Sequence, residues 1–116
     1  MLIFVVSQRL ALRDRVHSCL LELLPTGESS IENIAKKLGV SKRTLQRRLK
    51  GESTSFKDVL NQTRKKLARY YLKNSNISGG EISFLLGFDD PNSFFRAFQT
   101  WTGTTPESFR KEKTNF

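Results

Sequence analysis

The residues best suited to chemistry lie in one stretch, Ser41 to Lys50, which reads SKRTLQRRLK. Five of these ten residues are basic and none is acidic. Leu45 and Leu49 are four residues apart, so in a helix they share one face that can be buried. The opposite face then carries cationic side chains and the amide of Gln46. Because arginine and glutamine hydrogen-bond purines in the DNA major groove, this face is a candidate base-reading surface.

A basic helix on its own is more often an ordinary solvated surface, so the charge of the whole chain matters. The formal net charge is +9. The segment from Lys36 to Lys73 holds thirteen basic residues against two acidic ones, a net of +11, which leaves 9 − 11 = −2 for the rest. A concentrated positive field attracts polyanions. We therefore expect nucleic acid as the first partner to consider and an anionic membrane surface as the second.

Other kinds of chemistry have little support. Cys19 is the only cysteine and His17 the only histidine, so no intrachain disulfide and no cysteine-rich metal site can form. We interpret the two as a core thiol and a surface imidazole. The carboxylates are scattered and form no catalytic set, so we predict that the chain is not an enzyme and holds no cofactor or metal.

The location of the protein is predicted from two weaker signals. The longest apolar run, Met1 to Val6, is too short to cross a bilayer and lacks the positive leader of a signal peptide. A single unpaired cysteine is typical of a reducing compartment. We therefore expect a cytoplasmic protein without a membrane partner.

The rest of the sequence predicts an all-α fold of about seven helices, formed by two helix-turn-helix subdomains and a long linking helix. We expect residues 1–9 to be a tail or the remnant of a preceding segment, 10–54 the first subdomain, 55–74 the linking helix and 75–113 the second subdomain. The first helix is expected at about residues 10–24, ended by Pro25 and Gly27.

The elements next to the basic stretch are predicted to position it. Ser29 and Glu32 have the spacing of a capping box, which indicates a helix over about residues 30–38. Gly39 suits the left-handed residue that follows such a helix, and Ser41 suits the N-cap of the next one. A helix, a glycine turn and a basic helix form the helix-turn-helix pattern.

The linking helix is predicted over residues 56–73, with a length of about 27 Å. Its buried stripe is expected to comprise Phe56, Leu60, Thr63, Leu67 and Tyr71, widened by Val59 and Tyr70, and its exposed side Arg64, Lys65, Lys66, Arg69 and Lys73. Beyond it, Ser78 and Glu81 form a second capping box, and Asp90 can cap a helix that starts at Pro91. A last short helix starts at Thr105-Pro106, with Arg110, Lys111 and Lys113 expected to be exposed.

The two halves of the chain repeat one pattern. Leu38-Gly39-Val40 corresponds to Leu86-Gly87-Phe88 at an offset of 48 residues. Beyond the turn the offset becomes 49, so that Leu45, Arg47 and Leu49 correspond to Phe94, Arg96 and Phe98. One such motif is a weak signal, but two in register are unlikely to arise by chance. Two recognition helices about 34 Å apart would enter successive major grooves on one face of DNA.

These motifs resemble the DNA-binding domain of AraC/XylS-type transcription regulators over about residues 16–111. The resemblance implies a bacterial activator or repressor, nucleoid-associated when bound, with RNA polymerase as a candidate partner. It also implies a separate sensor or dimerisation domain. The residues that carry it are Ile82 to Phe98 with Gly87-Phe88 and Phe94-x-Arg96-x-Phe98, then Gly103-x-x-Pro106-x-x-Phe109-Arg110, and in the first half Thr44 to Leu49, Ser55-Phe56, Arg64 and Leu67-Ala68.

The resemblance also implies roles for single residues. In the first recognition helix it points to Arg43, Gln46 and Arg47 as base readers, with Ser41, Lys42 and Lys50 on phosphates. In the second it points to Asn92, Phe95 and Arg96. Phe95 departs from the small or polar residue usual there, and it either touches a thymine methyl group or is an additional core residue.

The second recognition helix is expected to contribute less affinity. Asp89 and Asp90 precede it and Arg96 is its only basic residue. The alternative to a sequence-specific regulator is a nonspecific architectural DNA- or RNA-binding protein, although the aromatic sheet motifs of RNA-binding modules are absent from the sequence.

Overall fold

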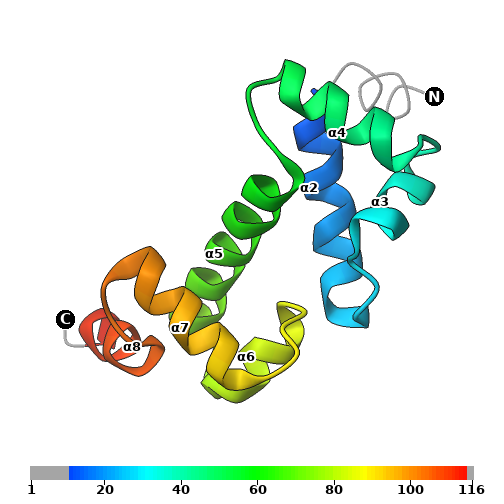
Figure 1. Ribbon diagram of the computed structural model, residues 1–116. Helices are drawn as coiled ribbons and strands as arrows, with labels where there is room; N and C mark the ends of the chain where they lie inside the picture. The colour runs from blue at the N-terminus through cyan, green and yellow to red at the C-terminus, as the bar shows by residue number, and fades with distance from the viewer. Residues whose placement is uncertain (1–10, 115–116) are drawn as a thin grey trace, which may run out of the picture. The chain divides into compact units, whose positions relative to one another are not determined.

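The computed structural model describes residues 11–114, which form seven α-helices and no strand (Figure 1). The predicted all-α class with two helix-turn-helix motifs is thereby confirmed. The tail expected at residues 1–9 lies outside the described residues. The helices are α2 (Leu12–Leu23), α3 (Ile31–Lys37), α4 (Lys42–Gly51), α5 (Phe56–Asn74), α6 (Gly79–Leu85), α7 (Pro91–Thr102) and α8 (Pro106–Thr114), with a 3-10 turn (Leu24–Thr26) after α2.

The described chain divides into two compact units. The first contains α2, α3, α4 and the part of α5 up to Thr63. The second contains residues 24–27, the rest of α5 from Arg64, and α6 to α8. Helix α5 thus contributes its two halves to different cores.

The first unit is held together by an apolar core and by a carboxylate from the turn after α4. Glu52 accepts hydrogen bonds from the backbone amides of Leu12 and Arg13, at 2.8 and 3.0 Å. These amides are among the unpaired donors of the first turn of α2, so Glu52 ties the start of α2 to the end of α4. Buried side chains of this unit include Leu12, Val16, Cys19, Leu20, Ile34, Ala35, Leu45, Leu49, Val59 and Thr63.

His17 is not the surface imidazole that the sequence suggested. Its Nδ1 lies 2.7 Å from the hydroxyl oxygen of Thr63. That hydroxyl donates to the carbonyl of Val59 at 2.8 Å, so it accepts from His17, whose Nδ1 therefore carries the hydrogen. The hydrogen bond gives the buried hydroxyl group of Thr63 a partner from α2. The sequence could not predict this contact, because the two residues lie 46 positions apart in the chain.

The second unit has an aromatic core. Phe94 and Phe98 are fully buried, with their ring centroids 5.8 Å apart, and Phe109 of α8 packs edge-on against Phe98 at 5.6 Å. The rest of the core comprises Ala68, Leu72, Ile82 and Leu86, with Leu67, Tyr71, Ile77, Phe88 and Trp101 packed against it.

Three residues of this unit contradict the predicted faces. Tyr70 is 60% exposed instead of widening the buried stripe of α5. Arg64 was expected on the exposed side, but it is part-buried and donates to the carbonyls of Leu86 and Gly87 at 2.8 and 2.9 Å. Arg110 is likewise part-buried and donates to the carbonyls of Leu72 and Tyr71 at 3.2 and 3.5 Å. Both arginines thus bond carbonyl groups near the end of a helix.

The start of α3 also differs from the prediction. Its N-cap is Ser30, whose hydroxyl accepts from the amide of Asn33, and not Ser29. The prediction favoured Ser29 because Glu32 lies three residues after it. Gly79 and Gly80 both lie within α6, and Ser78 caps it as predicted.

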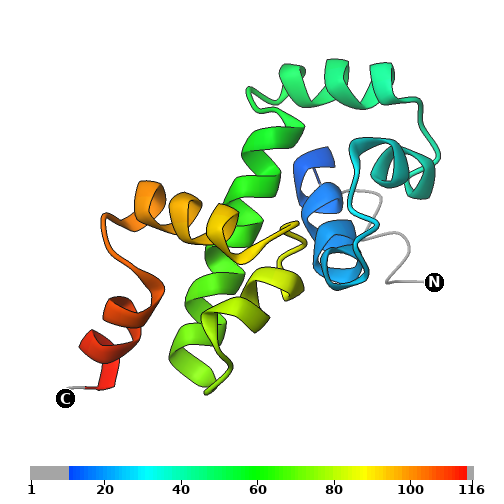
Figure 2. The same cartoon turned by 60° about the horizontal axis from the view of Figure 1, so that its bottom comes forward.

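The internal repeat is confirmed in the hydrogen bonds of the two turns. Gly39 and Gly87 both have positive φ, at +74° and +76°. The amide of Val40 donates to the carbonyl of Ala35 at 3.0 Å, and that of Phe88 to Ser83 at 3.1 Å, a pattern that ends both first helices with the same motif. Figure 2 shows α4 after the turn that follows α3, and α7 after the turn that follows α6.

Candidate nucleic-acid interface

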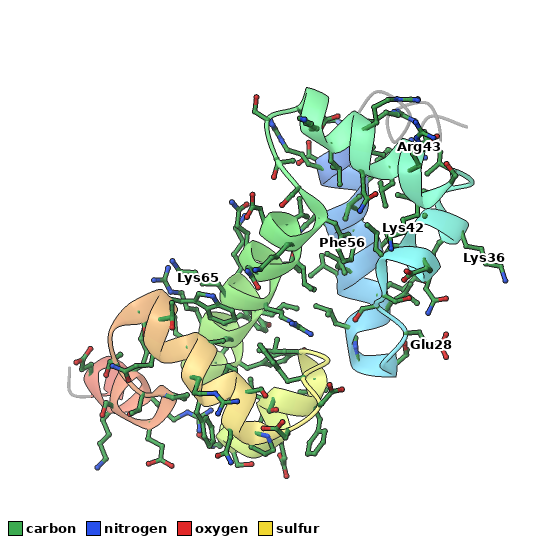
Figure 3. The ribbon with its side chains drawn as sticks, in the orientation of Figure 1. Glu28, Lys36, Lys42, Arg43, Phe56 and Lys65 are labelled. Atoms are coloured by element: carbon green, nitrogen blue, oxygen red, sulfur yellow. The ribbon has the colours of Figure 1, made fainter. Side chains whose placement is uncertain are left out.

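Helix α4 presents the predicted side chains on one exposed surface. Ser41 accepts from the amide of Thr44 at 3.1 Å and so starts the helix where the sequence predicted. Leu45 and Leu49 are fully buried. The exposed residues are Ser41, Lys42, Arg43, Gln46, Arg47, Arg48 and Lys50, and Lys42 and Arg43 are labelled in Figure 3.

Lys42 has a partner that the sequence did not reveal. Its ammonium group lies 3.2 Å from a carboxylate oxygen of Glu32 on α3. The pKa of Glu32 is lowered, first by a hydrogen bond from the backbone amide of Glu32 and then by the hydrogen bond from Lys42. Both side chains are well exposed, and such pairs contribute little free energy, so Glu32 holds the ammonium group of Lys42 only weakly.

Helix α7 repeats this arrangement with less charge. Asp90 caps it through the amide of Ser93 at 2.8 Å and also accepts the Ser93 hydroxyl at 3.0 Å. These two hydrogen bonds lower the pKa of Asp90. Its carboxylate thus stabilises the first turn. Asn92, Phe95 and Arg96 are exposed, while Phe94 and Phe98 point into the core.

Phe95 is neither fully free nor buried. It is 37% exposed, its ring centroid lies 5.8 Å from that of Phe94, and its Cε1 atom lies 2.9 Å from the place that a Cβ atom at Gly79 would occupy. One edge of the ring therefore rests on the backbone at the start of α6.

Two basic groups of α5 were not among the candidate site residues taken from the sequence. Lys57, in the first turn of α5, lines a hollow of about 420 Å³ together with Gln46 and Lys50. Its signal was obscure because it lies outside the basic stretch and is brought there by the turn at residues 52–55. It adds a cation beside the exposed face of α4.

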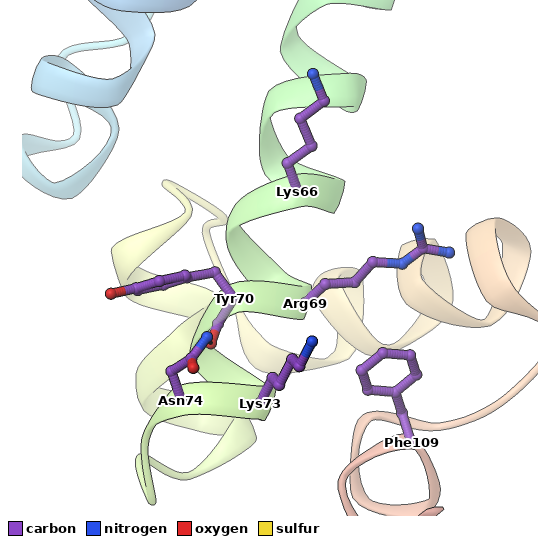
Figure 4. Close-up of a pocket in the computed structure, with 6 residues that line it drawn as sticks. All are labelled: Lys66, Arg69, Tyr70, Lys73, Asn74 and Phe109. Carbon is purple, nitrogen blue, oxygen red and sulfur yellow. Dashed lines mark hydrogen bonds between the residues drawn. The ribbon is translucent and has the colours of Figure 1, made fainter. Parts of the chain in front are cut away.

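The other group lies on the second half of α5. Lys66, Arg69 and Lys73 line a shallow pocket of about 490 Å³ with Tyr70, Asn74 and Phe109 (Figure 4). These three cations make no ion pair within the described part of the chain. The sequence predicted their exposure, but not that Phe109 of α8 would lie across from them.

Other functions gain no support from the described residues. No three histidine, cysteine, aspartate or glutamate side chains among them are grouped as a metal site would require. No described helix is long and apolar enough to cross a membrane. Cys19 is buried, and burial raises the pKa of its thiol, which disfavours the reactive thiolate.

Comparison with known proteins supports the reading of the fold. The helix-turn-helix domain family matches residues 34–112. The ornithine utilization regulator of Pseudomonas aeruginosa is 41% identical over 81 residues, 70% of this chain and 24% of that protein. The transcriptional regulator VirS of Mycobacterium tuberculosis is 36% identical over 99 residues, 85% of this chain and 29% of that protein. The chain thus spans about a quarter of the length of these relatives.

A solved structure is similar to this chain in its fold. The crystal structure of the DNA-binding domain of AdpA, in complex with a target DNA, superposes with a TM-score of 0.70 at 25% identity. The match covers 86% of this chain and 90% of that one. The repeated turns, the two buried helix faces and these similarities together place the chain in the family of AraC-type helix-turn-helix domains.

Proposed function

We propose that the chain binds double-stranded DNA sequence-specifically through α4 and α7 and so regulates bacterial transcription. The observation that carries this proposal is the exposed face of α4. It combines five cations and an amide with no carboxylate, on a helix whose other face is anchored by the buried Leu45 and Leu49. The DNA complex of a structural relative supports the same conclusion.

Within this proposal the residues divide into two groups. Arg43, Gln46 and Arg47 on α4 would contact base edges, since arginine and glutamine form paired hydrogen bonds with guanine and adenine. Ser41, Lys42 and Lys50 would hold phosphates, which fixes the register of the helix on DNA. On α7, Asn92 and Arg96 would contact the second half-site, together with Phe95.

We propose that residues 10–54 and 75–113 each read one half-site and that residues 55–74 link them. Successive major grooves require half-sites about 10 base pairs apart. RNA polymerase and a separate sensor or dimerisation domain are proposed as further partners on the strength of the family alone. We place the activity in the bacterial cytoplasm, at the nucleoid.

The decisive experiment is the selection of bound sequences from random duplexes. We expect two enriched blocks whose centres lie about one helical turn apart. Equal recovery of all sequences, with binding that depends only on salt, would instead indicate a nonspecific architectural DNA- or RNA-binding protein. Competition with duplex RNA in the same assay distinguishes a nonspecific DNA-binding protein from an RNA-binding protein.

A further inference from the structure

The second recognition helix carries an apolar side chain where the first carries a polar one. The repeat places Phe95 at the position of Gln46, 49 residues earlier. Phe95 is 37% exposed, and it is the one large apolar side chain that α7 leaves exposed. The exposed part of the ring therefore presents an apolar group on the outward surface of the second recognition helix.

The ring lies against a glycine in the neighbouring helix. An ideal Cβ atom at Gly79 would lie 2.9 Å from Cε1 and 3.4 Å from Cζ of Phe95, and 4.0 Å from Cβ of Pro106. The ring thus occupies space that any other residue at this position would fill. In the first unit the corresponding residue, 48 earlier, is the partly buried Ile31. In the first unit the large apolar residue of this pair of positions is Ile31, and its counterpart is Gln46. In the second unit the large apolar residue is Phe95, and its counterpart is Gly79.

Gln46 and Phe95 occupy corresponding places in their units, but their charged neighbours differ. Gln46 and Phe95 each line a hollow beside the start of the next helix. Ser55 and Thr105 cap those next helices with the same 3.1 Å bond to the amide three residues on. In the first hollow the basic neighbours are Lys50 and Lys57. In the second, of about 210 Å³, the charged neighbour is Glu107.

We propose that Phe95 contacts the 5-methyl group of a thymine in the half-site bound by the second unit, and that Gly79 is the positioning residue for its ring. The proposal rests on the proposed function. A phenyl ring forms no hydrogen bond with a base edge, and the thymine methyl is the apolar group that the major groove presents. With Glu107 beside it in place of a lysine, this site gains little from phosphate and depends on the apolar contact.

Gly79→Ala is expected to move the ring without disturbing the fold. Alanine is a better helix former than glycine, and the side chain in the way is the free end of a ring with open space beside it. Gly80→Ala is the matched control. It makes the same change one residue later, where the new Cβ atom would meet only the Ser78 hydroxyl at 3.9 Å.

The test uses a selected duplex in which each thymine of the second half-site is replaced by uracil, one position at a time. This change removes only the methyl group. For the unaltered protein we expect one position at which uracil weakens binding about fourfold, the effect of burying one methyl-sized group. Phe95→Ala and Gly79→Ala should both lose this thymine preference, whereas Gly80→Ala should keep it. In the Phe95→Ala background, Gly79→Ala should cause no further change.

The outcomes separate this inference from the proposed function. If no sequence is selected at all, the proposed function and the inference are both overturned. If a specific site is selected but no thymine in the second half-site responds to uracil, the inference alone is wrong. If Phe95→Ala abolishes the preference and Gly79→Ala retains it, the assignment of Gly79 is overturned. The Phe95→Ala comparison stands whether or not Gly79→Ala folds.

Discussion

The guanidinium carbon of Arg64 lies 4.0 Å from the centroid of the Phe88 ring. The same group donates to the carbonyls of Leu86 and Gly87 after α6. One side chain of α5 therefore contacts both the backbone and the aromatic ring of the turn in the second helix-turn-helix motif. Burial lowers the pKa of Arg64, which Asp89 partly counteracts. An arginine nevertheless remains charged at neutral pH.

Replacing Arg64 should therefore destabilise the second unit. Arg64→Ala removes two charge-assisted hydrogen bonds and the ring contact, and we expect a loss of about 2–3 kcal/mol in the free energy of unfolding. Trp101 is the only tryptophan and lies in this unit, 6.3 Å from Phe88 between ring centroids. Its fluorescence during denaturant unfolding gives the measurement. The exposed Lys66→Ala should change stability by less than about 0.5 kcal/mol, and an equal loss for both variants would refute the role of Arg64.

The cap of α7 should make the second unit sensitive to acid. Hydrogen bonds from Ser93 lower the pKa of Asp90 in the folded state. The carboxylate therefore stabilises the fold above its ordinary value of 3.8, and this contribution is lost as the pH falls through the lower, folded-state pKa. Asparagine caps helices about as well as aspartate but does not titrate. The free energy of unfolding of Asp90→Asn should thus fall less between neutral pH and pH 3 than that of the unaltered protein. Denaturant unfolding monitored by Trp101 fluorescence at each pH gives this comparison. Parallel loss in both proteins would contradict this.

Arg47→Ala should weaken specific binding and change the base preference at one position. Loss of a paired hydrogen bond to guanine is expected to cost about 1–3 kcal/mol. Lys66→Ala, on the exposed face of α5, should leave base preference unchanged. Affinities for selected and scrambled duplexes provide the comparison, and an equal loss on both would show that Arg47 contacts a phosphate.

The salt dependence of binding should differ between the two motifs. Each phosphate contact adds about 0.9 to the slope of log K against log salt concentration. Residues 41–50 carry five positive charges and no negative one, whereas residues 89–101 carry one positive and two negative charges. Removing Lys42 and Lys50 together, the two lysines proposed to hold phosphates, should therefore flatten the slope markedly, and Arg96→Ala should change it by about one unit or less.

That comparison requires one duplex that carries both half-sites. If Arg96→Ala flattens the slope as much as the double variant does, the two motifs share the electrostatic attraction equally. The asymmetric mode of binding proposed for them would then be wrong.

Much of the architecture followed from local signals in the sequence. Ser41, Ser78 and Asp90 were recognised as caps because a cap bonds an amide three residues on in the chain. Gly39 and Gly87 marked the turns because a left-handed residue is unfavourable for other side chains. The exposed face of α4 was also predictable from local sequence, because the spacing of Leu45 and Leu49 decides which residues of the helix remain exposed.

The sequence by itself therefore determined the helices, their repeat, and which side chains of α4 face outward, because these depend on contacts within a few residues. Only the tertiary structure decided the roles of Arg64, Arg110, His17 and Glu52, whose partners lie from 22 to 46 residues away. The same is true of Phe95, whose ring lies against Gly79 of another helix. A polar or aromatic side chain on a helix boundary can face solvent or a neighbouring element, and the choice depends on which unpaired carbonyl, amide or bare backbone the fold brings beside it.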